Sequence, residues 1–225
     1  MIRGAIFDLD GTLLDSNPFW DKAPGAYLAT LGKQAKPELA RTIFAMTLPE
    51  AADYMTMEYG LTQTPEEIVK GVNAAMENFY LHDAPLKAGV LTLLCALKER
   101  RVPCAVASVT DKPLVEGVLR RFNIQDYFSA VVTTSEVGAG KQKPDVYLRA
   151  AELINSLPQE TLVFEDALHA VRTASRAGFL AVGVYDTASA DKQDEIKALS
   201  TFYLRDFSDL SGVLAGNICD GEEPL

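Results

Sequence analysis

Cysteine, basic clusters and long apolar runs are scarce in this 225-residue sequence, and each absence excludes a class of protein. The three cysteines, Cys95, Cys104 and Cys219, have a spacing that fits neither a zinc site nor a CxxC redox motif. We expect Cys95 and Cys104 to be small buried hydrophobes in a reducing compartment. No apolar stretch approaches the ~20 residues of a membrane helix, and residues 2–9 are too short and too charged for a signal peptide. The sequence therefore indicates a cytoplasmic protein without a membrane partner.

Positive charge is also in short supply. Lys and Arg number 21 against 31 Asp and Glu, for a formal net charge of −10, and no Lys/Arg cluster occurs. A nucleic-acid partner is excluded, because such binders carry a basic footprint. An acidic protein that handles an anionic substrate must concentrate positive charge locally, in a metal ion or in one or two lysines. The 48% hydrophobic and 23% charged residues are typical of a globular chain with a sizeable core.

The pattern of apolar residues differs between two parts of the chain. Residues 15–85 show helical spacing only, with Thr64-Pro65-Glu66-Glu67 as a helix start. Residues 1–14 and 86–225 alternate short apolar runs with helical segments. Strands are predicted at 5–7, 102–108, 130–133, 162–164, 180–184 and 202–204, and helices at 90–100, 112–122, 146–157, 168–177 and 191–199. This alternation predicts an α/β core of 1–14 and 86–225, a Rossmann-like parallel sheet with helices on both faces. Residues 15–85 would be an inserted all-helical domain.

The first predicted strand ends in a pair of carboxylates, Asp8 and Asp10. Ligands of doubly wound sheets bind beyond the carboxyl ends of the strands, so this is the place to look for chemistry. Carboxylates two residues apart lie on one side of an extended segment and repel unless they share a cation or a proton. Asp8 could then attack phosphorus and Asp10 transfer the proton, while backbone N–H groups at Gly11 and Thr12 cradle phosphate oxygens. The alternative is a solvated Asp-rich turn.

Three further polar groups follow predicted strands. Ser108 could donate to a phosphate oxygen, and Lys141 in a glycine-rich loop could supply positive charge. Glu165 and Asp166 suit a hard cation with oxygen ligands. Taken singly, each has an ordinary explanation: a cap at Ser108, a solvated loop at Lys141, a helix N-cap at Asp166. Their common position at strand ends of one sheet favours a shared site.

In these motifs the sequence resembles the haloacid dehalogenase (HAD) superfamily, and in particular its phosphatase and β-phosphoglucomutase-like branch. Residues 8–15, Asp8-Leu9-Asp10-Gly11-Thr12-Leu13-Leu14-Asp15, match the DxDGTLxD opening motif of the family. Ser108 matches the second motif, Gly140-Lys141 with Pro144-Asp145 resembles the third, and Glu165-Asp166 the fourth. The match covers nearly the whole chain, in order.

The resemblance implies a Mg²⁺-dependent phosphatase acting on a small phosphorylated metabolite. Asp8 would form an aspartyl-phosphate, and Asp10 would be the general acid/base. Mg²⁺ would be held by Asp8, the Asp10 carbonyl and Asp166, with Glu165 beside it. The presence of Asp10 favours phosphoryl chemistry over the dehalogenase and phosphonatase activities of the family. Residues 15–85 would be the family's C1 cap, a lid with hinges near 16–18 and 82–85.

The resemblance also implies that Ser108 and Lys141 grip the phosphoryl group. Two departures from the family pattern bear on this. Gln142 stands where Pro usually follows the lysine, so that Lys143 competes with Lys141 for the role. Ala167 and Ala170 replace the usual Ser and Gly of the fourth motif. Neither change removes a charged ligand.

Two alternatives to a phosphatase stay open. A sugar-phosphate mutase must hold a second phosphate, often with a cap arginine, and residues 45–50, where it would be expected, contain none. Thr12, where such mutases often carry Val, also favours a hydrolase. The other alternative is a catalytically idle, partner-binding relative, but such a chain would normally have lost Asp8, Asp10 or the lysine.

Overall fold

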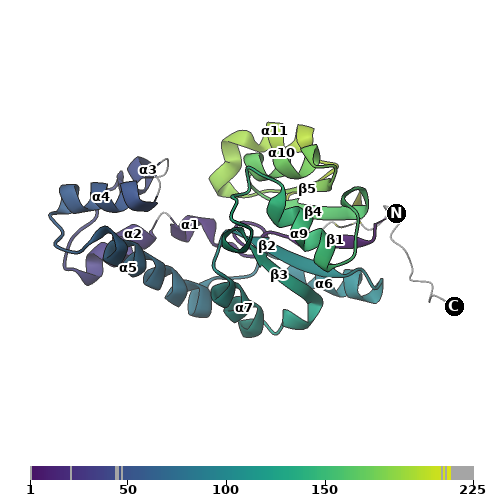
Figure 1. The fold of residues 1–225 in the computed structure, drawn as a ribbon, viewed down its shortest axis with the longest axis horizontal. Coiled ribbons are helices and arrows are strands. Elements are labelled where there is room, and N and C mark those ends of the chain that lie inside the picture. Colours follow the sequence, from purple (N-terminus) through teal and green to yellow (C-terminus); the bar gives the residue numbers. More distant parts are fainter. Residues whose placement is uncertain are drawn as a thin grey trace. The chain divides into compact units, whose positions relative to one another are not determined.

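The computed structural model describes residues 2–20, 22–43, 46, 48–208, 210, 212 and 213. The chain divides into two compact units, one formed by Met1–Asp15 with Pro85–Leu225 and the other by Ser16–Ala84. The first unit is built on a parallel sheet and the second, within the described residues, on helices (Figure 1).

The sheet of the first unit has six parallel strands in the order β3-β2-β1-β4-β5-β6. They are β1 (Gly4–Phe7), β2 (Cys104–Ser108), β3 (Phe128–Thr133), β4 (Thr161–Glu165), β5 (Leu180–Val184) and β6 (Phe202–Leu204). From β1 the chain builds outward through β2 to β3, then crosses back to β4 on the other side of β1. Because crossovers between parallel strands are right-handed, this reversal puts the connecting helices on opposite faces. The predicted α/β fold class is confirmed.

The helices of this unit follow the strands. They are α6 (Val90–Glu99), α7 (Lys112–Arg121), α8 (Thr134–Val137), α9 (Asp145–Leu153), α10 (Leu168–Arg176) and α11 (Gln193–Leu199), with short 3-10 turns η2 (Gln125–Tyr127), η3 (Pro158–Glu160) and η4 (Thr187–Lys192). On one face Ile6 and Val163 pack with apolar residues of α9, α10 and α11. On the other, the Phe7 ring stacks on Phe164 with centroids 4.4 Å apart. Both faces of the sheet are thus buried, as its uninterrupted apolar strands require.

Two predicted helices differ from the observed ones by more than one residue at an end. The helix predicted at 146–157 ends at Leu153, because Asn155 adopts a left-handed backbone with φ of 51° that stops the helix. The helix predicted at 191–199 begins at Gln193, preceded by η4, which has a non-helical residue at Ser189. Beyond the end of the first helix the apolar spacing continues through Ile154 and Leu157 although the backbone has already turned, so the sequence pattern does not show the break.

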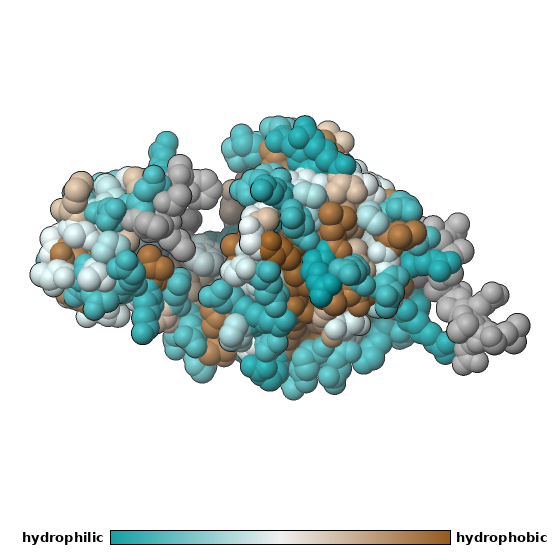
Figure 2. All heavy atoms as spheres, viewed as in Figure 1, coloured by the Kyte–Doolittle hydropathy of each residue, from teal (hydrophilic) through white to brown (hydrophobic). Residues whose placement is uncertain are grey.

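The second unit contains α1 (Asn17–Trp20), α2 (Ala23–Thr30), α3 (Leu39–Ile43), α4 (Leu48–Tyr59) and α5 (Pro65–Asn78), followed by a π-helical turn η1 (Phe79–Asp83). The predicted start at Thr64 is confirmed as a capping box, in which the Thr64 hydroxyl accepts the Glu67 N–H and the Glu67 carboxylate accepts the Thr64 N–H. Leu28, Met55 and Ile68 belong to a core of this unit's own. Along the described chain we find no helix that is both apolar and long enough to span a bilayer, and polar residues cover much of the face drawn in Figure 2.

The prediction that Cys95 and Cys104 are both buried is confirmed for one of them only. Cys104 is buried in β2, as expected. Cys95 is exposed on α6, so its prediction as a buried hydrophobe is wrong; its thiol lies 3.2 Å from the Tyr127 hydroxyl, at the surface. Cys219 lies outside the described residues.

Candidate active site

The candidate site lies where the strand order reverses, at the carboxyl ends of β1 and β4. Asp8 directly follows β1, Glu165 is the last residue of β4, and Asp166 comes next. The Asp8 N–H donates to the Phe164 carbonyl at 3.0 Å, which extends the pairing of the two strands into the site. Doubly wound sheets bind ligands at this switch point, because the loops there diverge to opposite faces and leave a crevice.

Three carboxylates meet at this point. Asp8, Glu165 and Asp166 are all buried, and each offers an oxygen such that the three oxygens lie within 4.8 Å of one another. Burial and the neighbouring Glu165 charge raise the pKa of Asp8 well above its ordinary value. The same two causes, with Asp186, raise the pKa of Asp166 to about 7. The fold therefore holds negative charge together against desolvation and repulsion.

Lys141 is the cation inside this cluster. Its side chain is only 4% exposed, and its Nζ donates to Asp8 Oδ1 and, at 2.6 Å, to Glu165 Oε1. Burial alone would lower the pKa of Lys141, but the Asp8 and Glu165 carboxylates outweigh it and raise the pKa above its ordinary value. The Tyr147 hydroxyl, from α9, donates to the same Glu165 oxygen at 2.7 Å. Lys143, the competitor, is exposed.

The cluster of Asp8, Glu165, Asp166 and Lys141 fits a hard divalent cation. Three carboxylates against one ammonium leave an excess of negative charge in a buried place. Burial first, and this charge second, raise the pKa values of Asp8 and Asp166. A divalent ion would cancel that excess, and all-oxygen donor sets of this kind suit Mg²⁺, Ca²⁺ or Mn²⁺ rather than softer metals. The donor set thus supports binding of a divalent metal.

Asp10 differs from the three buried acids in its exposure and in its hydrogen-bond partner. It is half-exposed, and its Oδ2 accepts the Thr110 hydroxyl at 2.7 Å. The Thr110 N–H in turn donates to Ser108 Oγ at 3.0 Å, which links the end of β2 to the loop after β1. Gly11 follows with φ of 75°, a left-handed conformation that favours glycine, and its N–H donates to the Leu14 carbonyl at 2.9 Å.

Thr12 is fully buried. Its hydroxyl oxygen is inaccessible and has no hydrogen-bond partner within the described part of the chain. A buried hydroxyl without a partner costs about 1–3 kcal/mol. The phosphate contact predicted for Thr12 is through its backbone N–H and does not depend on this hydroxyl.

The structure excludes one alternative role for Asp166 and brings two further residues, Thr110 and Tyr147, into the candidate site. The position that caps α10 is Ala167, without a side-chain bond, so a helix N-cap role for Asp166 is wrong. Thr110 and Tyr147 were absent from the sequence prediction. Thr110 left a faint signal, a second hydroxyl two residues beyond Ser108, whereas Tyr147 sits at an apolar helical position and left none.

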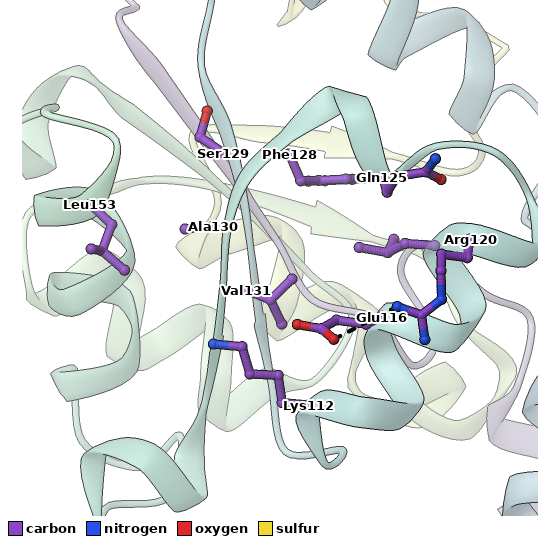
Figure 3. Close-up of a pocket in the computed structure, with 10 residues that line it drawn as sticks. Lys112, Glu116, Arg120, Gln125, Phe128, Ser129, Ala130, Val131 and Leu153 are labelled. Carbon is purple, nitrogen blue, oxygen red and sulfur yellow. Dashed lines mark ion pairs between the residues drawn. The ribbon is translucent and has the colours of Figure 1, made fainter.

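A separate hollow of about 590 Å³ lies along the edge strand β3, lined in part by Lys112, Glu116 and Arg120 (Figure 3). Its cations are already paired, Arg120 with Glu116 at 3.8 Å and Lys112 with Glu136 at 2.9 Å. The lining contains no residue of the four motifs, so we assign it no part in the chemistry.

Comparison with known proteins places this geometry in context. Residues 5–184 match the model of a family described as haloacid dehalogenase-like hydrolase. A Thermotoga maritima protein named phosphorylated carbohydrates phosphatase is 28% identical over 177 residues, covering 79% of this chain and 82% of that protein. Hexitol phosphatase B of Escherichia coli is 30% identical over 182 residues, covering 78% and 80%. These names agree with the predicted phosphoric monoester hydrolase.

Solved structures show the same fold. A Thermotoga maritima structure named as a candidate β-phosphoglucomutase has a TM-score of 0.83 at 25% identity, covering 96% of this chain and all of the other. CbbY of Rhodobacter sphaeroides, solved in complex with phosphate, has a TM-score of 0.78 at 22% identity, covering 93% and 96%.

Proposed function

The chain belongs to the haloacid dehalogenase-like hydrolases, and we propose that within this family it is a Mg²⁺-dependent phosphatase of a small phosphorylated metabolite. The observation that carries the proposal is the buried cluster of Asp8, Glu165, Asp166 and Lys141 at the switch point of the sheet. An idle relative has no need to maintain three buried carboxylates around one lysine, because the arrangement costs stability.

The proposed reaction has two steps. The Asp8 carboxylate attacks phosphorus and forms an acyl phosphate, while Asp10 gives its proton to the leaving oxygen. Asp10 then removes a proton from water, which attacks the phosphorus of the acyl phosphate and releases phosphate and Asp8. The half-exposed position of Asp10 and its bond to Thr110 support this division of roles, since a proton carrier must reach both the leaving group and water.

The phosphoryl group is held by two groups in this proposal. Ser108 Oγ accepts the Thr110 N–H, so its own hydrogen remains to donate to a phosphate oxygen. Lys141, already between Asp8 and Glu165, supplies positive charge beside the attacking carboxylate. A Mg²⁺ ion held by Asp8, the Asp10 carbonyl and Asp166, with Glu165 beside it, would neutralise charge on the phosphoryl oxygens.

The substrate class follows from the relatives and the helical unit. We propose a phosphorylated carbohydrate or polyol, because the two relatives described above bear names of that kind. We also propose that residues 16–84 act as the family's cap. The two links to this unit leave the core side by side: the Asp15 N–H donates to the Pro85 carbonyl at 3.0 Å, and Leu14 bridges to Leu86. Paired links of this kind can act as one hinge.

A mutase is the second candidate, favoured by the structural likeness to the candidate β-phosphoglucomutase. The segment 45–50, which lacks the expected arginine, lies partly outside the described residues. The two functions separate in one assay. A hexose 1-phosphate incubated with the protein and Mg²⁺ should release inorganic phosphate; formation of the hexose 6-phosphate instead would establish the mutase.

The test of the proposed mechanism is Asp8→Asn. We expect turnover of p-nitrophenyl phosphate with Mg²⁺ to disappear, and EDTA to silence the native protein reversibly. Asp126→Asn, an exposed acid on η2, is the control and should keep full activity. Normal turnover by Asp8→Asn would overturn the mechanism. A panel of phosphorylated sugars and polyols, assayed for phosphate release, then identifies the substrate class.

A further inference from the structure

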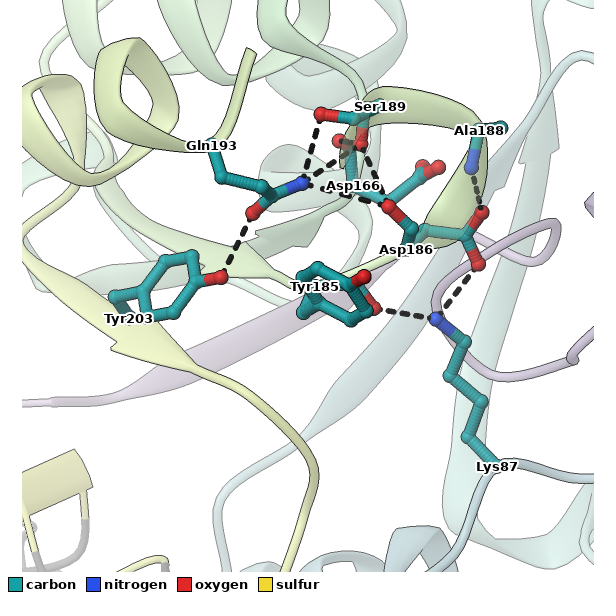
Figure 4. Close-up of polar contacts among 8 residues, drawn as sticks. All are labelled: Lys87, Asp166, Tyr185, Asp186, Ala188, Ser189, Gln193 and Tyr203. Atoms are coloured by element: carbon teal, nitrogen blue, oxygen red, sulfur yellow. Dashed lines mark hydrogen bonds and ion pairs between the residues drawn. The ribbon is translucent and has the colours of Figure 1, made fainter. Parts of the chain in front are cut away.

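A buried ion pair outside the four motifs lies beside the candidate metal site. Lys87 Nζ is 2.8 Å from Asp186 Oδ2, with the two side chains 13% and 1% exposed. Lys87 Nζ also donates to the Tyr185 carbonyl at 2.7 Å. Asp186 is the second residue after β5, and Lys87 comes shortly after the chain re-enters the core at Pro85. Figure 4 shows the lysine reaching both partners.

Lys87 ties together two loops that flank the end of β4. Its backbone N–H donates to the Leu13 carbonyl, in the loop after β1, at 2.9 Å. Its side chain grips Tyr185 and Asp186, in the loop after β5. In the sheet β4 lies between β1 and β5, so the lysine bridges the two neighbours of the strand that carries Glu165 and Asp166.

Asp186 carries this connection on to Asp166. Its Oδ1 accepts the Ala188 N–H at 2.9 Å and so caps η4. The capped turn places the Ser189 hydroxyl 2.8 Å from the Asp166 carbonyl, to which it donates. Gln193 Nε2 donates to the Ser189 hydroxyl and carbonyl, both at 3.0 Å, and the Tyr203 hydroxyl donates to Gln193 Oε1 at 2.7 Å. The backbone of Asp166 is thus held from outside its own strand (Figure 4).

We propose that Lys87, Asp186 and Ser189 are positioning residues that fix Asp166 and thereby set the affinity of the site for Mg²⁺. The inference rests on the proposed function, since it concerns the same metal. Partners behind a metal ligand usually affect metal affinity because they fix where the ligand points before the ion arrives. The pair is neutral overall: the Asp186 charge adds to the repulsion at Asp166, and the Lys87 ammonium offsets part of it.

The experiment measures Mg²⁺ binding to the metal-free protein by titration calorimetry. We expect Lys87→Met and Asp186→Asn each to weaken Mg²⁺ binding about 10–100-fold, and Ser189→Ala about fivefold, as for one neutral hydrogen bond. The control is Tyr203→Phe, which removes a bond of the same network remote from Asp166 and should bind Mg²⁺ within about twofold of the native protein. With p-nitrophenyl phosphate, kcat at saturating Mg²⁺ should fall far less than the affinity.

A single variant could fail to fold, because it leaves one buried charge unpaired. The double variant Lys87→Met with Asp186→Asn removes both charges, and circular dichroism checks its fold. It should bind Mg²⁺ as weakly as the singles. Native-like Mg²⁺ affinity in the folded double variant, or a loss in Tyr203→Phe as large as in Asp186→Asn, would overturn the positioning role. If the native protein itself binds no Mg²⁺, the proposed function fails instead.

Discussion

Replacing Lys141 by methionine tests the charge balance of the candidate site directly. The side chain is 4% exposed and bonds to Asp8 and Glu165, which are themselves buried. Methionine keeps much of the volume but removes the cation, so two buried carboxylates lose their partner. Removing one member of a buried ion pair typically costs about 3–5 kcal/mol. A buried acid can reduce that cost by taking up a proton, so the loss should be larger at pH 8 than at pH 6.

The assay is urea unfolding at pH 8 with EDTA and again with Mg²⁺. In EDTA we expect the free energy of unfolding to fall by about 3 kcal/mol or more, and Mg²⁺ to restore part of it, since the ion replaces the missing positive charge. Hydrolysis of p-nitrophenyl phosphate with Mg²⁺ should fall about 10²–10³-fold in kcat, as for loss of one preorganised donor to a developing negative charge.

Lys143→Met is the matched control, two residues along the same loop. Lys143 is exposed, so the free energy of unfolding should change by no more than about 0.5 kcal/mol, and activity should stay near that of the native protein. The reasoning is refuted if Lys141→Met is as stable as the native protein in EDTA at pH 8. If Lys143→Met loses activity and Lys141→Met keeps it, the phosphate contact belongs to Lys143.

Three other predictions follow from individual residues. The folded pKa of Asp166 is raised to about 7 from an ordinary 3.8, so the metal-free protein loses stability as pH rises through that window. The increase in melting temperature caused by Mg²⁺ should therefore grow from pH 5 to pH 8, and Asp166→Asn should reduce that growth, with the raised pKa of Asp8 accounting for the remainder. Thr110→Val removes the donor to Asp10 and should lower kcat about tenfold with little change in melting temperature, whereas unchanged kcat would exclude a role in orienting Asp10. Thr12→Val removes a buried hydroxyl without a partner in the described chain, so the free energy of unfolding should stay the same or rise by about 1 kcal/mol; a marked loss would show that the hydroxyl has a partner.

The fold followed from the sequence where local pattern and tertiary position agree. The strand at Leu180–Val184 has the predicted bounds, because a buried parallel strand is apolar at every position and is punctuated at both ends. The helix at Asp145–Leu153 was predicted too long, because Ile154 and Leu157 continue its apolar spacing although Asn155 has already turned left-handed. Apolar spacing records which residues face the core, and a turn can satisfy that requirement as well as a helix.

The residues of the candidate site were predictable only where they belong to a recognisable motif at a strand end. Asp8, Glu165 and Asp166 each end or follow a strand, and parallel strands bring such positions to one edge. Thr110 has only a faint signal, a second hydroxyl two residues beyond Ser108, and Tyr147 has none. Tyr147 is two residues into α9, and only the packing of that helix on β1 and β2 brings its hydroxyl to Glu165. A partner that depends on the path of a helix across the sheet has no signature in a single sequence.

The buried cluster explains how a chain with a net charge of −10 can act on a phosphate ester. In the proposed reaction Asp8 must be ionised to attack, yet burial and Glu165 favour its protonated form. Lys141 opposes that tendency by bonding to Asp8 and Glu165 together, and a divalent ion would oppose it further. The same positive charges attract the phosphoryl group. Activation of the nucleophile and binding of the anion are therefore one electrostatic requirement, and an acidic surface elsewhere does not conflict with it, because exposed charges are screened within about 10 Å.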